Sequence, residues 1–321
     1  MGRLVSGLSI RDFRKSDLHN VIEVASLSFA KEFEVTGFDL NHIEKLVNRI
    51  FGIPGRVFLT ISRVLGVEPF KLLVAEVSDR VVGTTMISRD GRVAYISAVM
   101  VHPNYRRRGI ARRLLESALE YIRAKKIRRA VLHVIPTNSP AKTLYAELGF
   151  KDFERIARLT MNTELILRPE DVGGVKIGCF RKSHANAVYH LIQVSEDPKH
   201  LEIFDFKKSD LQDTVLESVF RFSTRRRIVA VRDNHPIGYV EAVYTTPQEA
   251  GQIDNVQVCP EMKGRGIEEM LIYQGASEIN GIGTKKIIGT ASSGKPELIT
   301  AMEKLGFKRC LELDGMFAEF E

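Results

Sequence analysis

Residues 99–111 read VMVHPNYRRRGIA, an apolar strand followed by a proline turn, a basic loop and the first turn of a helix. A helix N-terminus attracts anions because its first backbone N–H groups are unpaired and its dipole is positive there. Gly109 lacks the Cβ that would hold a ligand away from the backbone, and the small Ala111 leaves room beside the next turn. This stretch therefore predicts a phosphate-binding loop.

The sequence around the loop favours a helix packed against a sheet. An apolar strand covers residues 95–101, and apolar side chains follow the loop at a spacing of four, at Ile110, Leu114, Ala118 and Ile122. We expect further strands over 4–13, 72–78, 81–87 and 130–134, and a helix over 139–148 that Gly149 ends. This order predicts an α/β (mixed α+β) domain with an antiparallel start and a parallel crossover.

The two halves of the chain repeat each other at an offset of 157 residues. The loop region recurs at Val256, Val258, Pro260, Arg265, Gly266, Ile267 and Leu271, and LGFK at 148–151 recurs at 305–308. FRKS at 13–16 returns at 180–183, so the first half has extra residues before its loop, which we assign to 51–70. The 321 residues thus predict two domains, 1–165 and 174–321, with a proline- and glycine-containing boundary at 167–174.

The loop resembles the coenzyme A pyrophosphate loop of the Gcn5-related N-acetyltransferase (GNAT) superfamily, whose pattern Arg106, Gly109 and Ala111 fill. For the two domains that the repeat predicts, the resemblance implies a mixed, mostly antiparallel sheet with helices on both faces in each, and it implies acetyl-CoA as cosubstrate. It implies that the backbone of the strand before the loop holds the acetyl carbonyl and pantetheine. The coenzyme-binding residues it implies are Val99, Met100, Val101, Arg106, Arg107, Arg108, Gly109, Ile110, Ala111, Arg112 and Asn138.

Residues 132–150, LHVIPTNSPAKTLYAELGF, resemble the Nα-acetyltransferase branch of that superfamily in the spacing of His133, Asn138 and Tyr145. The resemblance implies that His133 acts as a base with Tyr95 as its partner, and that Asn138 contacts the coenzyme. It also implies that Tyr145 gives a proton to the departing thiolate or orients the sulfur. From the residues alone, His133 could equally be a hydrogen-bonded core histidine and Tyr95 a packed strand residue.

The second copy changes the residues that carry the chemistry. Arg106, Ala111, Asn138 and Tyr145 are replaced at the same offset by Lys263, Glu268, Lys295 and Met302, and His133 by Thr290. A carboxylate inside a phosphate loop repels the ligand. We expect a degenerate second domain that packs on the first or shapes its substrate groove, with a second active site as the alternative.

Charge and composition narrow the class of partner. The net charge of +7 divides into +11 on residues 1–160 and −4 on the rest, and ten basic side chains against two acidic ones fall within 106–130. Such a surface attracts coenzyme A, whereas nucleic acid is disfavoured because no aromatics are interleaved for base stacking. No apolar run reaches the roughly 18 residues of a membrane span, and no signal segment begins the chain, so we expect a cytoplasmic protein. Three scattered cysteines predict no disulfide framework or metal site.

The reaction expected from these residues is acetyl transfer from acetyl-CoA to a primary amine by direct attack on the thioester. An imidazole suits an α-amine, with a pKa of about 7.7 to 8.0, better than a lysine near about 10.4. Against a peptide N-terminus, residues 26–40 and 155–162 lack the peptide-gripping and paired-tyrosine motifs of many relatives, so a small-molecule amine stays open. The alternative is a non-catalytic protein that binds acetyl-CoA or a partner.

Overall fold

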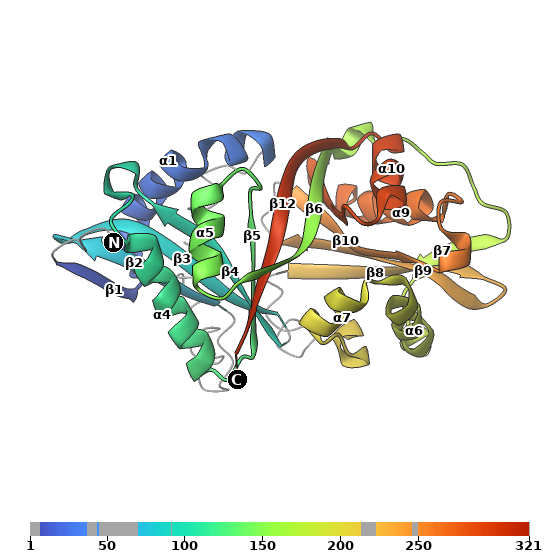
Figure 1. Ribbon diagram of the computed structural model, residues 1–321. Coiled ribbons are helices and arrows are strands. Elements are labelled where there is room, and N and C mark those ends of the chain that lie inside the picture. The colour runs from blue at the N-terminus through green and yellow to red at the C-terminus, as the bar shows by residue number, and fades with distance from the viewer. Residues whose placement is uncertain are drawn as a thin grey trace. The chain divides into compact units, whose positions relative to one another are not determined.

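The computed structural model describes residues 7–36, 44, 70–90, 92–212, 223–245 and 250–320 (Figure 1). The insertion assigned to residues 51–70 lies outside the described residues except for Phe70. The chain forms two compact units, Met1–Asp152 with Gly315–Glu321, and Phe153–Asp314. No helix within the described ranges is both long and apolar enough to cross a membrane.

The first unit is built on a mixed sheet. Its elements are β1 (Leu8–Asp12), α1 (Leu18–Thr36), β2 (Phe70–Val77), β3 (Arg80–Asp90), β4 (Val93–Val101), α4 (Ile110–Ala124), β5 (Arg129–Val134) and α5 (Ser139–Glu147). Strands β1 to β4 pair antiparallel in chain order, and β5 pairs parallel with β4 across the α4 crossover. The predicted α/β fold, with its antiparallel start and parallel crossover, is confirmed.

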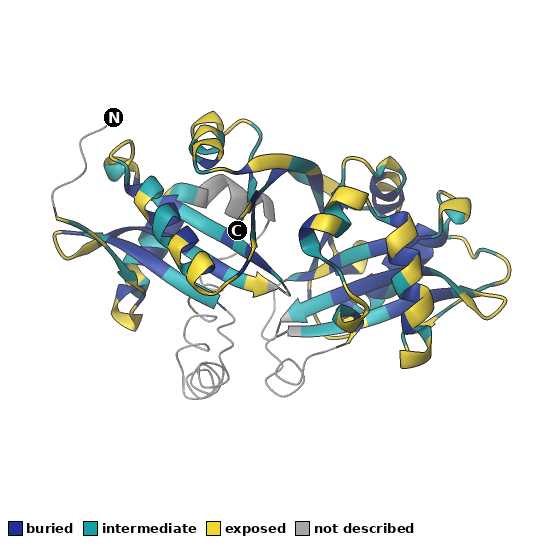
Figure 2. Ribbon diagram, turned by 60° about the horizontal axis from the view of Figure 1, so that its bottom comes forward, coloured by how far each residue is buried: buried dark blue, intermediate teal, exposed yellow. Residues whose placement is uncertain are grey.

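Helices cover both faces of this sheet because apolar side chains alternate along its strands. On β2, Leu73 and Ala75 pack in the same cluster as the buried residues of α4, whereas Val74 packs with Val21 of α1. Alternate strand residues point to opposite faces, so one strand serves both layers. Figure 2 shows the buried residues following the strands and the inward sides of the helices.

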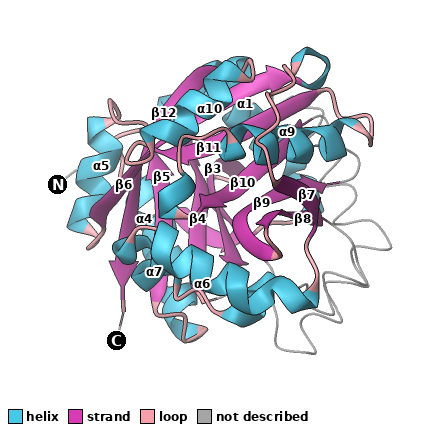
Figure 3. Cartoon of the chain, turned by 90° about the vertical axis from the view of Figure 1, so that its right-hand side faces the viewer, coloured by secondary structure: helices cyan, strands magenta, loops and turns pink. Residues whose placement is uncertain are grey.

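The second unit repeats the plan. Its elements are β6 (Lys151–Asn162), β7 (Val175–Cys179), α6 (Ala185–Ser195), α7 (Pro198–Phe204), β8 (Ser223–Arg232), β9 (His235–Thr245), β10 (Ala250–Val258), α9 (Ile267–Asn280), β11 (Lys286–Ser292) and α10 (Pro296–Lys304). The last strand, β12 (Lys308–Glu319), begins in this unit and ends in the first. Strands β7 to β10 are antiparallel neighbours and β11 is parallel to β10. Figure 3 shows α9 and α6 on opposite sides of these strands.

The last strands of the two halves are exchanged. From Phe153 onward β6 belongs to the second unit and pairs antiparallel with β11, while from Gly315 onward β12 belongs to the first unit and neighbours β5. Figure 1 shows the red β12 ending at the C-terminus next to β5. The compact units therefore differ from the ranges 1–165 and 174–321 expected from the sequence.

The side chains of the exchanged strands confirm where each one is buried. Leu159 and Met161 of β6 lie in the core of the second unit. Their repeat equivalents on β12, Met316 and Ala318, lie in the core of the first. Residues 155–162, which the sequence interpretation assigned to the first domain, therefore belong to the second unit.

Candidate functional site

A bulge and a splayed strand pair create an opening in the first unit's sheet. Strand β4 pairs with β5 only at residues 93–95. Just beyond, Ala98 has a φ of +52°, and the register between β3 and β4 shifts by one residue. Thr85, opposite the bulge, donates a hydrogen bond from its hydroxyl to the Ser97 carbonyl oxygen at 3.3 Å. The backbone of Val99, Met100 and Val101 thus follows the point where β4 leaves β5.

The loop after β4 has the backbone shape that an anion requires. Pro103–Tyr105 forms one 3-10 turn, and α4 begins at Ile110 with Gly109 as its N-cap. Arg107 and Gly109 have φ values of +61° and +77°, which alternate with ordinary conformations. Backbone N–H groups converge in such alternating conformations and form a concave anion-binding surface. No acidic side chain stands in the first turn of α4.

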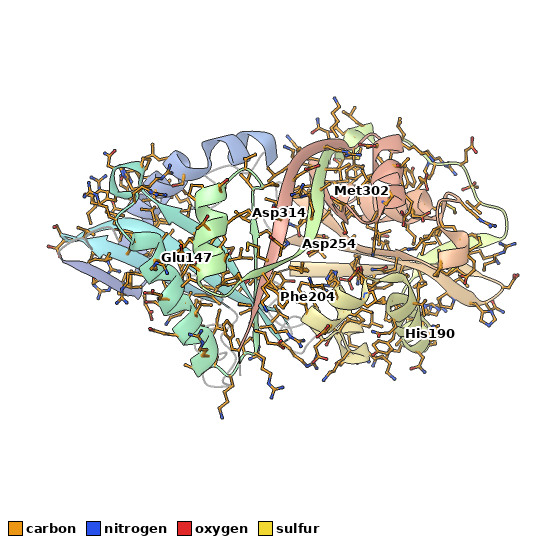
Figure 4. The ribbon with its side chains drawn as sticks, viewed as in Figure 1. Glu147, His190, Phe204, Asp254, Met302 and Asp314 are labelled. Carbon is orange, nitrogen blue, oxygen red and sulfur yellow. The ribbon has the colours of Figure 1, made fainter. Side chains whose placement is uncertain are left out.

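The arginines predicted to bind the coenzyme have different neighbours. Arg106 donates from Nε to the Val101 carbonyl oxygen at 3.1 Å, which ties the loop to the end of β4. Arg107 and Arg108 are exposed. Arg112 forms an ion pair with Glu147 of α5, and Figure 4 labels Glu147 on that helix. If Arg112 binds the coenzyme, its guanidinium group must either contact the coenzyme and Glu147 together or break the ion pair with Glu147.

Tyr145 of α5 is buried without a hydrogen-bond partner for its hydroxyl among the described residues. Its side chain packs in the cluster of α4 and contacts Phe150 edge to face. Burial raises the pKa of Tyr145 to about 12, so the hydroxyl keeps its proton at neutral pH. Since the hydroxyl makes no hydrogen bond to the described residues, it is available to a bound ligand.

His133 and Tyr95 lie on the sheet face opposite Tyr145. Their strand neighbours Leu132 and Ala94 point into the α4 cluster, so the alternation turns His133 and Tyr95 the other way. Tyr95 pairs with Val131 on the neighbouring strand, so His133 lies two residues beyond the partner of Tyr95. Both side chains are half-buried. The opening between β4 and β5 therefore has the proposed base and its tyrosine partner on one face and the proposed acid on the other.

Asn138 caps α5. Its side-chain oxygen accepts a hydrogen bond from the Ala141 backbone N–H at 3.3 Å, and the residue is exposed. Capping alone explains an asparagine at this position. His102, which has no assigned role, caps the 3-10 turn in the same way through Nδ1 and the Asn104 N–H.

The second unit keeps this backbone and replaces its side chains. Asn255 has a φ of +51° at the position equivalent to Ala98, and β10 pairs with β11 only at residues 250–253. Met302, labelled in Figure 4, stands where Tyr145 would be and is fully buried in an apolar core. The opening is thus retained without the hydroxyl.

A polar network of the second unit could not be predicted from the sequence. Lys295, equivalent to Asn138, contacts Glu196 Oε2 through Nζ at 2.9 Å, and Gln257 Nε2 donates to the same oxygen at 2.6 Å. Ser195 donates to Gln257 Oε1 at 2.9 Å. The only sequence signal is the change from asparagine to lysine at 295, which does not reveal its partner on a distant helix end. In the parts of the chain that the structure describes, no cluster of His, Cys, Asp and Glu could hold a metal ion.

Comparisons with known protein sequences relate this chain to acetyltransferases. The model of the acetyltransferase (GNAT) family matches residues 45–150. A protein of Pectobacterium atrosepticum named as an acetyltransferase is 31% identical over 108 residues, which are 34% of this chain and 74% of that protein.

Solved structures share the fold over nearly the whole chain. A tandem GNAT protein from the clavulanic acid biosynthesis pathway covers 97% of this chain and 98% of its own, at a TM-score of 0.64 and 17% identity. A GCN5-related N-acetyltransferase from Sphaerobacter thermophilus covers 98% of this chain and 96% of its own, at a TM-score of 0.67 and 14% identity. The family model and the relative that is 31% identical over 74% of its length show that this chain belongs to the GNAT family of acetyltransferases.

Proposed function

We propose that the first unit transfers the acetyl group of acetyl-CoA to a primary amine, either a protein N-terminal α-amine or a small-molecule amine. The family uses acetyl-CoA. The observation that carries the proposal is the buried Tyr145, whose hydroxyl has no partner among the described residues, beside an anion-type loop and a splayed strand pair. The first unit has all three features, and the second has lost the tyrosine.

The chemistry follows from the two faces of the opening. An amine arriving on the His133 face loses a proton to His133, directly or through Tyr95 and water, and attacks the thioester carbonyl. Backbone N–H groups at 99–101 stabilise the oxygen on which negative charge develops. The thiolate leaves on the opposite face, where Tyr145 donates its proton. The nitrogen of the new amide releases its extra proton to water, and Tyr145 regains a proton from water, so the cycle balances. Residues 106–112 with Asn138 hold the coenzyme.

The spacing of His133, Asn138 and Tyr145 supports an α-amine acceptor of the Nα-acetyltransferase type. Residues 155–162 belong to the second unit, and their equivalents on β12, residues 312–319, likewise contain no tyrosine, so the missing tyrosine pair still counts against a peptide acceptor. The absence of a peptide-gripping motif at 26–40 still favours a small amine. A panel of peptides with free or blocked N-termini, alongside small amines, separates the two classes of acceptor by their kcat/KM values.

Tyr145→Phe tests the assignment of the proton donor. This variant keeps the ring and the packing against Phe150 but removes the hydroxyl. We expect kcat to fall by about 100-fold or more, the usual contribution of a positioned acid, with the Kd for coenzyme A unchanged in calorimetry. Met302→Leu, at the equivalent position of the second unit, is the matched control and should leave kcat unchanged.

Two outcomes would contradict this proposal. An unchanged kcat in Tyr145→Phe would remove the proton-donor role. Tight coenzyme binding by the unaltered protein, with no turnover of any peptide or amine in the panel, would instead favour a non-catalytic coenzyme-binding or partner-binding protein.

A further inference from the structure

The second unit retains the backbone of an anion loop. Gly264 and Gly266 have φ values of +68° and +91°, at the positions equivalent to Arg107 and Gly109. Helix α9 begins at Ile267 after the same kind of 3-10 turn, Pro260–Met262. The N–H groups of this loop therefore have the orientation that attracts an anion in the first unit.

A carboxylate of the chain itself accepts from this loop. Glu268, in the first turn of α9, stands where the first unit has Ala111. Its Oε1 accepts a hydrogen bond from the Gly264 backbone N–H at 3.0 Å. An alanine side chain at this position could not reach the loop, so the contact is specific to the second unit.

The carboxylate is enclosed as well as bound. Glu268 is only 3% exposed, and its Oε2 is buried without a hydrogen-bond partner among the described residues. Burial raises the pKa of Glu268, and the nearby carboxylates Glu269 and Glu297 add to the effect, whereas the Gly264 N–H opposes it. Burial of a carboxyl group with only one of its oxygens hydrogen-bonded is costly, and the Gly264 N–H is the contact that offsets part of this cost.

Two lysines at the loop also have carboxylate partners within the second unit. Lys263, equivalent to Arg106, lies 3.6 Å from Glu297 of α10. Lys295, equivalent to Asn138, pairs with Glu196 at 2.9 Å. Two cations and one N–H donor that a phosphate-bearing ligand would use are therefore already bound to carboxylates of the chain, whereas Arg265 in the loop is exposed.

We propose that residues 263–268 form a second phosphate-binding site, which Glu268 closes by occupying it with its own carboxylate. The ligand class is a diphosphate, either free or as part of a nucleotide coenzyme. In the unaltered protein the carboxyl group of Glu268 then occupies the second loop, and only the first unit binds coenzyme.

Glu268→Ala, which restores the first-unit residue, tests this inference. Calorimetry with inorganic diphosphate and with coenzyme A is best done in a Gly109→Glu background, where the first loop is disabled. We expect binding of either probe to rise from none to one per chain on adding Glu268→Ala. Glu268→Gln is the matched control: its amide oxygen still accepts from Gly264, so the site should stay closed.

The opposite substitution, Ala111→Glu, tests the same idea in the first unit. This part of the test rests on the proposed function, because it assumes that the first loop binds coenzyme A. Ala111→Glu should place a carboxylate against the N–H groups of residues 107–109 and weaken coenzyme A binding by about 100-fold or more. If Glu268→Ala fails to fold, Glu268→Gly and Ala111→Glu still provide the test.

The inference is overturned if folded Glu268→Ala and Glu268→Gly bind neither probe, or if folded Ala111→Glu binds coenzyme A as tightly as the unaltered protein. Acquisition of a site by Glu268→Gln as well would also overturn it, because charge repulsion rather than occupation would then keep the loop empty. Failure of the proposed acetyl transfer would appear separately, as absence of turnover with coenzyme binding intact.

Discussion

Gly109→Glu is expected to abolish coenzyme A binding by the first unit, and acetyl transfer with it. Gly109 has a φ of +77°, a conformation that costs a residue with a Cβ about 1–2 kcal/mol. The added carboxylate would also face the diphosphate. Two unit charges about 4 Å apart near a protein surface repel by about 4 kcal/mol, or about a thousandfold in affinity. Calorimetry with coenzyme A measures the loss directly.

The chain supplies the control for this variant. Gly266 has the same conformation in the second unit, with a φ of +91°, yet its loop is already occupied by Glu268. Gly266→Glu should therefore leave one coenzyme bound per chain. Gly109→Ala adds a Cβ without a charge, so it measures the effect of the backbone conformation alone. We expect the affinity for coenzyme A to fall about tenfold, as a cost of about 1–2 kcal/mol implies. Equal losses in Gly109→Glu and Gly266→Glu would contradict the assignment of the binding loop to the first unit.

The loop and the crossover could be predicted from sequence because their signals are local. Glycine at a left-handed position, proline at the turn and a spacing of four on the following helix lie within about 20 residues of each other. The sequence does not predict the bulge on β4. Its residue with a positive φ is Ala98, and alanine, unlike glycine or asparagine, does not indicate a positive φ. Its position is set by pairing with β3, which is a tertiary property.

The partners of charged residues were equally hidden. The lysine at 295 signalled a loss of function but not its ion pair with Glu196, 99 residues earlier. The carboxylate at 268 was expected to repel a ligand from the loop. The structure adds that it is hydrogen-bonded to the loop itself, which requires knowledge of the loop's N–H directions. Sequence spacing therefore located the two loops but not what occupies the second.

The exchange of β6 and β12 is the feature of the fold that is hardest to predict from the sequence. The two strands occupy equivalent positions in the repeat and have nearly the same pattern of buried and exposed positions. Either strand therefore satisfies either sheet by alternation alone. The order of the elements along the chain favours a pairing of β6 with β5 and of β12 with β11. In the structure, β6 instead pairs with β11, and β12 lies beside β5. Exchange of equivalent elements between repeats makes both units depend on both halves of the chain.

Met316→Ala is expected to destabilise the first unit, although Met316 lies in the second half of the sequence. Its side chain is 2% exposed and packs in the first unit's core. Truncation of a buried methionine to alanine costs about 2–5 kcal/mol. Hydrogen exchange followed by mass spectrometry should show faster exchange in β5 and α4, and calorimetry should show weaker coenzyme binding through the population of unfolded first unit.

Leu159→Ala is the matched variant, because Leu159 is the repeat equivalent of Met316 and is fully buried in the second unit's core. A loss of similar size is expected, but with faster exchange in β11 and α9 and with coenzyme binding retained. Two independently closed domains would give the reverse assignment, with Leu159→Ala loosening β5 and Met316→Ala loosening β11. The two exchange maps therefore decide which strand completes the unit that carries Tyr145, and hence whether the second half of the chain is required for the activity of the first.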